Sequence, residues 1–213
     1  MGRFLFWAAR CGVQRAEFYI IPHPANFVKT FFKNFLKNNF PKSVDKPHKV
    51  CYNKDTKERE VNTMANKMNI TINFDMDGTI ADLYGVDNWL EMLIAEDTTP
   101  YAEALPLLRL SALARKLNAL QRNGYNIAVI SWLSKNGSEA YNEAVIEAKM
   151  KWLARHLPSV RWDRVTIVPY GTPKQTFCDN PLDILFDDEE RNREAWTGRA
   201  YDVENILEVL REI

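Results

Sequence analysis

Four short apolar segments constrain the fold of this chain more than any other feature of its sequence. Each has the length and composition of a buried β-strand and leads to a polar or charged residue, and helical periodicity separates one from the next. The segments are Ile70–Phe74, Tyr125–Ile130, Arg164–Tyr170 and Asp183–Phe186. Because strands that alternate with helices form parallel sheets, the sequence predicts an α/β fold: a Rossmann-like parallel sheet flanked by helices.

The intervals between these strands carry the predicted helices. Periodicity predicts one helix over Asp82–Ala95, whose apolar side chains are expected to pack in the core, and a second over about Pro106–Asn123. A third is expected to begin at Ser138. A short strand near Ala200–Tyr201 and a helix over 203–210 close the chain.

Two carboxylates, Asp75 and Asp77, follow the first strand. Alternate residues of an extended chain point to the same side, so the two side chains are expected to lie close together. Such a pair ionises at low cost only when a cation lies between the charges or when one keeps its proton. This indicates a metal site, acid/base chemistry or both. The segment Asp75–Ile80 also fits the Asp-Gly turn of a hairpin, and the rest of the chain decides between the two.

Polar groups also follow the other strands. Ser131 follows the second strand, Lys174 stands in the loop after the third, and Asp187 and Asp188 follow the fourth. Alone, each is ordinary: a strand-end hydroxyl, a surface lysine, and acids that suit the start of a helix. In a parallel sheet, however, all of them gather on one rim, so their order is a stronger signal than any single residue.

In this order the motifs resemble those of the haloacid dehalogenase-like (HAD) hydrolase superfamily, over about Asn69–Ile213. The matching residues are Asp75, Asp77, Gly78, Thr79, Ser131, Lys174, Asp187 and Asp188. The resemblance implies a HAD-like sheet with a small helical cap over about residues 82–105. Within the superfamily, the chain resembles small-cap or capless phosphatases, including bacterial and phage 5′-nucleotidase-like members. A phosphorelay receiver domain fits worse, because its lysine comes last, and a P-loop or dinucleotide-binding loop is absent.

The resemblance implies a phosphomonoester hydrolase that forms an aspartyl-phosphate. Asp75 would be the nucleophile. Asp77 would be the general acid for the leaving alcohol and then the base for the attacking water. Ser131 would donate a hydrogen bond to a phosphate oxygen, and Lys174 would neutralise the carboxylates and the phosphate.

The resemblance also implies a phosphate-binding loop and a Mg²⁺ ion. Gly78 lets the loop turn sharply and come close to the phosphate, Thr79 braces the turn, and Ser131 and Lys174 complete the phosphate site. Oxygen ligands suit Mg²⁺. The implied ligands are the Asp75 carboxylate, the backbone carbonyl of Asp77 and the Asp187 carboxylate. Asp188 would complete the metal site by holding a metal-bound water or by helping to orient Lys174.

The expected substrate is a small phosphate ester, with nucleoside monophosphates first. The alternatives are a phosphatase acting on nucleic-acid ends and a non-catalytic module that binds phosphate or a partner. Residues 64–213 hold 16 Lys/Arg against 23 Asp/Glu, which argues against unassisted binding of nucleic acid by the catalytic domain.

Residues 1–63 form a separate, basic extension to the domain predicted over 64–213. They hold 12 Lys/Arg against 5 Asp/Glu, although the whole chain has a formal net charge of zero. Phe27–Lys37 has the pattern of a basic amphipathic helix, which binds membranes or partners. The alternatives are a disordered segment, a targeting segment, or residues that are not translated because the protein starts at Met64 or Met68. Membrane contact is expected only if the extension belongs to the protein, and Ile70–Phe74 is expected to be the first strand of the sheet.

Three scattered cysteines, Cys11, Cys51 and Cys178, form no metal-ligand spacing. An odd number at such positions suits a reducing compartment, so the sequence predicts a cytoplasmic protein.

Overall fold

The computed structural model describes residues 17–20 and 70–213. In this part of the chain, six strands form one sheet in the order β1-β6-β5-β2-β7-β8, and every neighbouring pair is parallel. The strands are β1 Glu17–Ile20, β2 Thr71–Phe74, β5 Asn126–Trp132, β6 Arg164–Val168, β7 Ile184–Phe186 and β8 Arg199–Tyr201. The predicted α/β fold with a parallel sheet is therefore confirmed.

Helices cover both faces of the sheet, as its burial pattern requires. On one face, β2 and β5 direct alternate residues such as Ile72 and Val129 into the main core. The helices α5 Leu110–Arg122, α6 Glu139–His156 and α8 Ile206–Glu212 close this core. The opposite face is covered near Trp196, at the end of α7 Glu190–Ala195. Burying one large aliphatic or aromatic side chain contributes about 1.5–3 kcal/mol, so this core provides most of the driving force.

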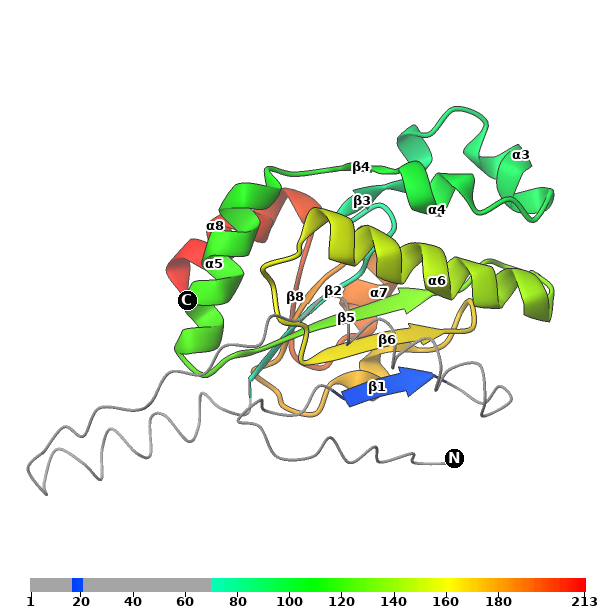
Figure 1. Ribbon diagram of the computed structural model, residues 1–213. Coiled ribbons are helices and arrows are strands. Elements are labelled where there is room, and N and C mark those ends of the chain that lie inside the picture. The colour runs from blue at the N-terminus through cyan, green and yellow to red at the C-terminus, as the bar shows by residue number, and fades with distance from the viewer. Residues whose placement is uncertain (1–16, 21–69) are drawn as a thin grey trace, which may run out of the picture.

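A small helical unit interrupts the chain after β2. It lies between β3 Ala81–Asp82 and β4 Leu105–Pro106, which pair antiparallel. The unit holds a 3-10 turn, η1 Leu83–Gly85, and the helices α3 Trp89–Ile94 and α4 Thr99–Glu103. We call residues 83–104 the cap segment. It stands above α6 in Figure 1, where the sequence predicts a small insertion.

The cap segment is tied to α6. The Tyr141 hydroxyl donates to the Asp97 carbonyl at 2.9 Å, and the Trp152 indole donates to the Ala104 carbonyl at 2.7 Å. Ser138 caps α6 by accepting from the Tyr141 amide, as predicted, and it also donates to the Glu96 carboxylate. The cap segment and α6 are therefore joined by side-chain hydrogen bonds as well as by packing.

The predicted helices around the cap segment were partly wrong. The helix expected over Asp82–Ala95 is broken, because the Asp82 carboxylate accepts from the Gly85 amide and closes a separate turn. The helix expected from Pro106 begins at Leu110, because Pro106 pairs in β4. The helix α4 was not predicted at all.

The sheet also has a strand that the sequence did not predict. β1 pairs with β6, with Glu17 opposite Arg164, so the first strand of the sheet is not Ile70–Phe74. The predictions for the amphipathic segment Phe27–Lys37, for a start at Met64 or Met68, and for Cys11 and Cys51 lie outside the described residues.

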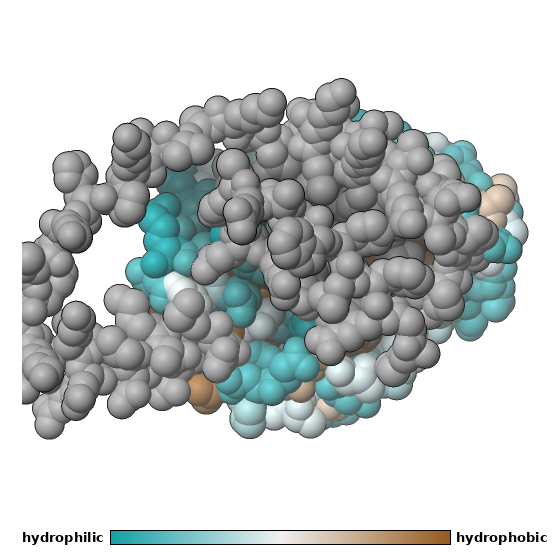
Figure 2. Space-filling model, turned by 60° about the horizontal axis from the view of Figure 1, so that its bottom comes forward, coloured by the Kyte–Doolittle hydropathy of each residue, from teal (hydrophilic) through white to brown (hydrophobic). Residues whose placement is uncertain are grey.

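No helix in the described ranges is both long and apolar enough to cross a membrane. On the face seen in Figure 2, the described surface is mostly hydrophilic, with few scattered hydrophobic residues.

Candidate active site

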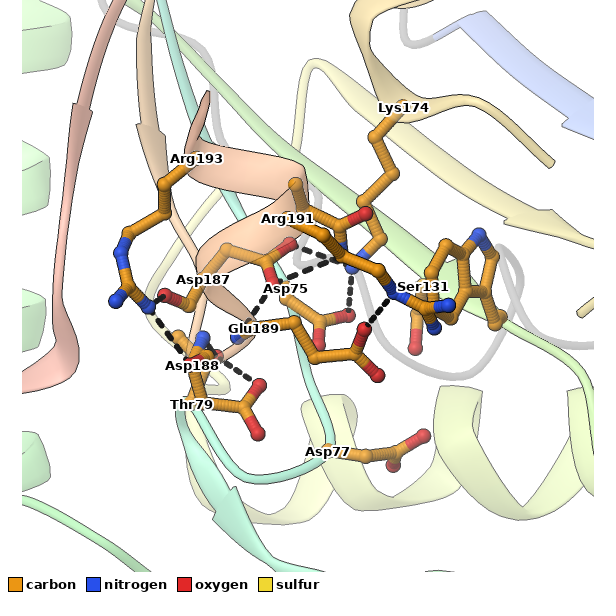
Figure 3. A network of polar contacts seen from close by, with 12 residues as sticks. Asp75, Asp77, Thr79, Ser131, Lys174, Asp187, Asp188, Glu189, Arg191 and Arg193 are labelled. Atoms are coloured by element: carbon orange, nitrogen blue, oxygen red, sulfur yellow. Dashed lines mark hydrogen bonds and ion pairs between the residues drawn. The ribbon is translucent and has the colours of Figure 1, made fainter. Parts of the chain in front are cut away.

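The order of the strands brings the predicted polar residues together. β2 lies between β5 and β7. Asp75 directly follows β2, Asp187 directly follows β7, and Ser131 is the second-last residue of β5, so all three lie at the same rim of the sheet. The Asp75 amide donates to the Phe186 carbonyl at 2.8 Å, so the sheet hydrogen bonding continues to the catalytic candidate itself. Lys174 begins the short turn η2 Lys174–Phe177 and reaches the same rim (Figure 3).

Lys174 joins two of these acids. Its Nζ lies 2.9 Å from Asp75 Oδ1 and 2.7 Å from Asp187 Oδ2, and its side chain is 1% exposed. Burial opposes the lysine's charge, but the attraction of Asp75 and Asp187 outweighs it and raises the pKa of Lys174. The lysine is therefore a fixed positive charge beside Asp75.

Three carboxylates form a group that could hold a cation. Asp75, Asp187 and Asp188 each offer an oxygen atom, and these oxygens lie within 4.8 Å of one another. Burial, followed by the charges of Asp75 and Asp187, raises the pKa of Asp188 to about 7. Burial and the charge of Asp75 also raise the pKa of Asp187. An all-oxygen donor set whose charges repel one another fits Mg²⁺.

Residues of α7 orient this group, and sequence reasoning missed them. Asn192 donates to Asp187 Oδ1 at 3.0 Å, and the Glu189 amide donates to the same oxygen at 3.0 Å. Arg193 donates to the backbone carbonyls of Asp187 and Asp188 at 2.8 Å and 2.7 Å. Asn192 and Arg193 follow Asp188 by four and five residues, and this closeness to the last motif is the signal that the sequence offers.

Gly78 and Thr79 shape the loop after Asp75. Thr79 is fully buried, and its hydroxyl donates to Asp188 Oδ1 at 3.3 Å while it accepts from the Asp188 amide at 3.2 Å. Thr79 therefore braces the loop against Asp188 from below the surface. Gly78 has φ +77°, and a Cβ atom there would lie 2.5 Å from Asp188 Oδ2 and 2.7 Å from the Tyr84 ring. Only glycine fits both the backbone angle and the space.

Asp77 lies apart from the three-acid group in Figure 3. It pairs with Lys149 of α6, whose Nζ lies 2.5 Å from Asp77 Oδ2. Burial, partly offset by the charge of Lys149, raises the pKa of Asp77. Sequence reasoning missed Lys149, although Val145, Lys149 and Leu153 follow one another at four-residue spacing on the buried face of the helix. A lysine in line with buried apolar residues was the available signal.

A pocket of about 440 Å³ opens above these residues. Asp75 and Asp77 line it, while Ser131, Lys174 and Asp187 are buried. Its walls are rich in aromatic rings: Tyr84, Trp89, Tyr101, Trp132 and Tyr170. The rings of Trp132 and Tyr170 lie 5.1 Å apart between centroids, and those of Tyr84 and Trp89 lie 5.0 Å apart.

The cap segment supplies part of this wall, which the sequence did not predict. Leu90 and Ile94 were expected to pack in the core, but they are 48% and 75% exposed and line the pocket. The cationic side chains of Lys135 and Arg191 lie over the ring of Tyr170, and Arg191 also lies over Trp132. The pocket thus combines acids, flat apolar walls and a cationic edge.

No family model matches the sequence, and none of the curated proteins matches it. Several solved structures are similar in fold, among them two phosphatases. One is the D,D-heptose 1,7-bisphosphate phosphatase from B. bronchiseptica, complexed with magnesium and phosphate, at 15% identity and a TM-score of 0.42. The other is the same kind of phosphatase from Burkholderia thailandensis, at 14% identity and a TM-score of 0.43. Each alignment covers 68% of this chain and 99% of the other.

Proposed function

We propose that this chain is a Mg²⁺-dependent phosphomonoester hydrolase that acts through an aspartyl-phosphate intermediate. The observation that carries the proposal is the position of Asp75. This carboxylate lines the pocket, contacts the buried ammonium of Lys174, and belongs to the three-acid group with Asp187 and Asp188. The four motifs that resemble the HAD-like superfamily supply the same residues in the same order.

The chemistry follows from these positions. An Asp75 oxygen attacks phosphorus in line and the bond to the ester oxygen breaks, while Asp77 gives its proton to the leaving alcohol. Water then attacks the phosphorus of the aspartyl-phosphate while Asp77 takes a proton from that water. The bond between phosphorus and the Asp75 oxygen breaks, which releases phosphate and restores the Asp75 carboxylate. Lys174 keeps positive charge beside the nucleophile, and Ser131 is the proposed hydrogen-bond donor to a phosphate oxygen.

Asp75, Asp187, Asp188 and the Asp77 carbonyl would hold the metal ion. When bound, Mg²⁺ supplies the positive charge that lets a carboxylate approach a phosphate dianion.

For the substrate, we propose a small phosphate ester whose alcohol carries a flat ring, with nucleoside monophosphates as the first choice. The aromatic walls support this choice, because rings stack on Tyr and Trp side chains through their faces and edges. The pocket volume also matches a ligand of this size.

The direct test is a panel of phosphate esters assayed with Mg²⁺ and with a chelator. We expect phosphate release that stops in the chelator, and faster turnover of nucleoside monophosphates than of aliphatic sugar phosphates. Asp75→Asn should remove the activity and leave the melting temperature close to that of the parent, because the two side chains have nearly the same shape.

Retention of more than about a tenth of the rate by Asp75→Asn would show that Asp75 is not the nucleophile. Failure of the whole panel, together with Mg²⁺-dependent binding of an ester that stays intact, would favour a binding module. Turnover confined to phosphorylated ends of oligonucleotides would favour the nucleic-acid end phosphatase.

A further inference from the structure

Lys149 is a second buried lysine at the site, and the reaction proposed above does not use it. It projects from the middle of α6 and is 0% exposed. A buried ammonium is expensive unless its protons are all hydrogen-bonded and its charge is paired. A methionine would fill the same space without a charge, so the contacts of this ammonium need an explanation.

All three protons of Lys149 have acceptors. Nζ donates to Asp77 Oδ2 at 2.5 Å, to Ser131 Oγ at 2.8 Å and to the Trp132 carbonyl at 2.6 Å. An ammonium group has three donors and no acceptor, so its capacity is fully used by these three groups. The three acceptors come from two separate places, the loop after β2 and the end of β5.

These contacts fix the orientation of two groups. Lys149 donates to Oδ2 of the Asp77 carboxyl. The other oxygen, Oδ1, is therefore the one that can contact a ligand in the pocket. Ser131 accepts through Oγ, so its own proton is available to another acceptor. The ring of Tyr101 in the cap segment lies 4.8 Å from Nζ, so the lysine also touches the wall of the pocket.

We infer that Lys149 is a positioning residue: by holding Oδ2, it aims Oδ1 of Asp77 at the oxygen of the leaving alcohol. The inference rests on the proposed hydrolase function. The proposed role of Lys149 is to orient Asp77, and Lys149 itself does not touch the substrate. Removing the Lys149 side chain therefore changes the reaction through Asp77. The effect should therefore depend on how much the leaving group needs an acid.

The test uses the full-length protein with Mg²⁺ and compares two substrates that differ in how much their leaving group needs protonation by an acid. The alcohol of adenosine 5′-monophosphate is a poor leaving group that needs a proton from an acid, whereas the leaving group of 4-nitrophenyl phosphate needs little help. We expect Lys149→Met to lower kcat for the nucleotide by about 10²-fold and kcat for the nitrophenyl ester less than about tenfold, because general acid catalysis is worth about 10²–10⁴-fold.

Lys151→Met is the matched control. Lys151 lies on the same helix, its side chain is 64% exposed, and it pairs with Glu147 at four-residue spacing. This variant should keep the kcat of the parent for both esters. A purely structural role for Lys149 would instead lower the two rates by the same factor, and that result, or no loss at all, would overturn the inference.

A second variant keeps the test decisive if Lys149→Met does not fold because Asp77 is left buried without a partner. The pair Asp77→Asn and Lys149→Met removes both charges together. We expect this double variant to cleave the nucleotide as slowly as Asp77→Asn alone, because the two residues act as one unit. A further loss of about tenfold or more would show that Lys149 acts independently of Asp77.

The parent protein separates this inference from the function on which it rests. No turnover of either ester by the parent would overturn both. Turnover by the parent with no change of the ratio in Lys149→Met would overturn only the role of Lys149.

Discussion

Two buried lysines pair with three of the four aspartates at the site. Lys174 pairs with Asp75 and Asp187, and Lys149 pairs with Asp77. Asp188 has the Thr79 hydroxyl as its neighbour, and its pKa is raised to about 7. The proposed nucleophile Asp75 and the proposed acid Asp77 therefore pair with different lysines, and Asp75 shares its lysine with Asp187.

Gly78→Ala tests the space around the loop after Asp75. The added Cβ would lie 2.5 Å from Asp188 Oδ2, so the carboxylate must move out of the proposed metal site. We expect a loss of kcat of at least about tenfold and a loss of unfolding free energy above the roughly 1–2 kcal/mol of a positive-φ alanine. Kinetics and chemical denaturation measure the two effects.

Gly171→Ala is the control for the backbone angle. Gly171 has φ +80°, but a Cβ there would have nothing within 4 Å. This variant should lose stability through its backbone angle and keep kcat within about threefold. Equal losses of kcat in the two variants would show that contact with Asp188 is not the cause.

At the scale of elements, α6 connects the cap segment to the catalytic rim. Its N-terminus is joined to the cap segment through Ser138 and Tyr141, and its middle turn carries Lys149 to Asp77. The helix α6 therefore contacts both the cap segment, which forms part of the pocket wall, and the proposed acid Asp77. A substitution at the start of α6 is expected to change the binding of the substrate.

Ser138→Ala removes a helix cap and the hydroxyl contact to Glu96 together. We expect a loss of about 1 kcal/mol in unfolding free energy, because a serine cap is worth about that much. We also expect a higher KM, since the cap segment lines the pocket, with little change in kcat. Ser138→Thr keeps the hydroxyl and should stay close to the parent; if it loses as much as the alanine variant, the hydroxyl is not responsible.

The sequence predicted some elements well for a physical reason. The strands β2, β5, β6 and β7 are buried on both faces, so their apolar runs are continuous and their ends are marked by polar residues. The cap segment has short helices that pack on one side only, and the turn at Asp82 ends a pattern that looks continuous in sequence. Lys149 was hidden because a lysine within a helix normally indicates the solvent face.

The position of β1 could not be predicted for a different reason. Pairing with β6 depends on a contact between residues far apart in sequence, and Glu17–Ile20 is four residues long in a basic segment. It also lies outside the alternation of strands and helices from which the other strands of the sheet were predicted.

At the scale of the whole molecule, the acids of the site make stability depend on pH. The pKa of Asp188 is raised from its ordinary value near 4 to about 7, so the folded protein binds this proton more tightly than the unfolded chain does. This contribution to stability is present below about pH 4 and is lost as the pH rises to about 7. Asp77 and Asp187 have raised pKa values in the same direction.

In a chelator, we therefore expect the melting temperature to fall between about pH 5.5 and about pH 8, and Asp188→Asn to reduce that fall. Mg²⁺ should raise the melting temperature by a few degrees at about pH 8 and less at about pH 5.5, since protons compete with the ion. Differential scanning calorimetry measures both. Two results would contradict the proposed cation site: a melting temperature that rises with pH in the chelator, or a melting temperature that does not change when Mg²⁺ is added at the higher pH.

The strand order has a consequence for the synthesis of the protein. β2 leaves the ribosome early among the strands that form the rim, yet its neighbours in the sheet, β5 and β7, are made later, and β7 is made near the end. The chemistry of Asp75 depends on Lys174 and Asp187, which arrive with that last part of the chain. Since domains fold as units during synthesis, a chain that stops early would carry the nucleophile without its cation. The order of the strands thus restricts the proposed activity to chains in which synthesis has passed Asp187.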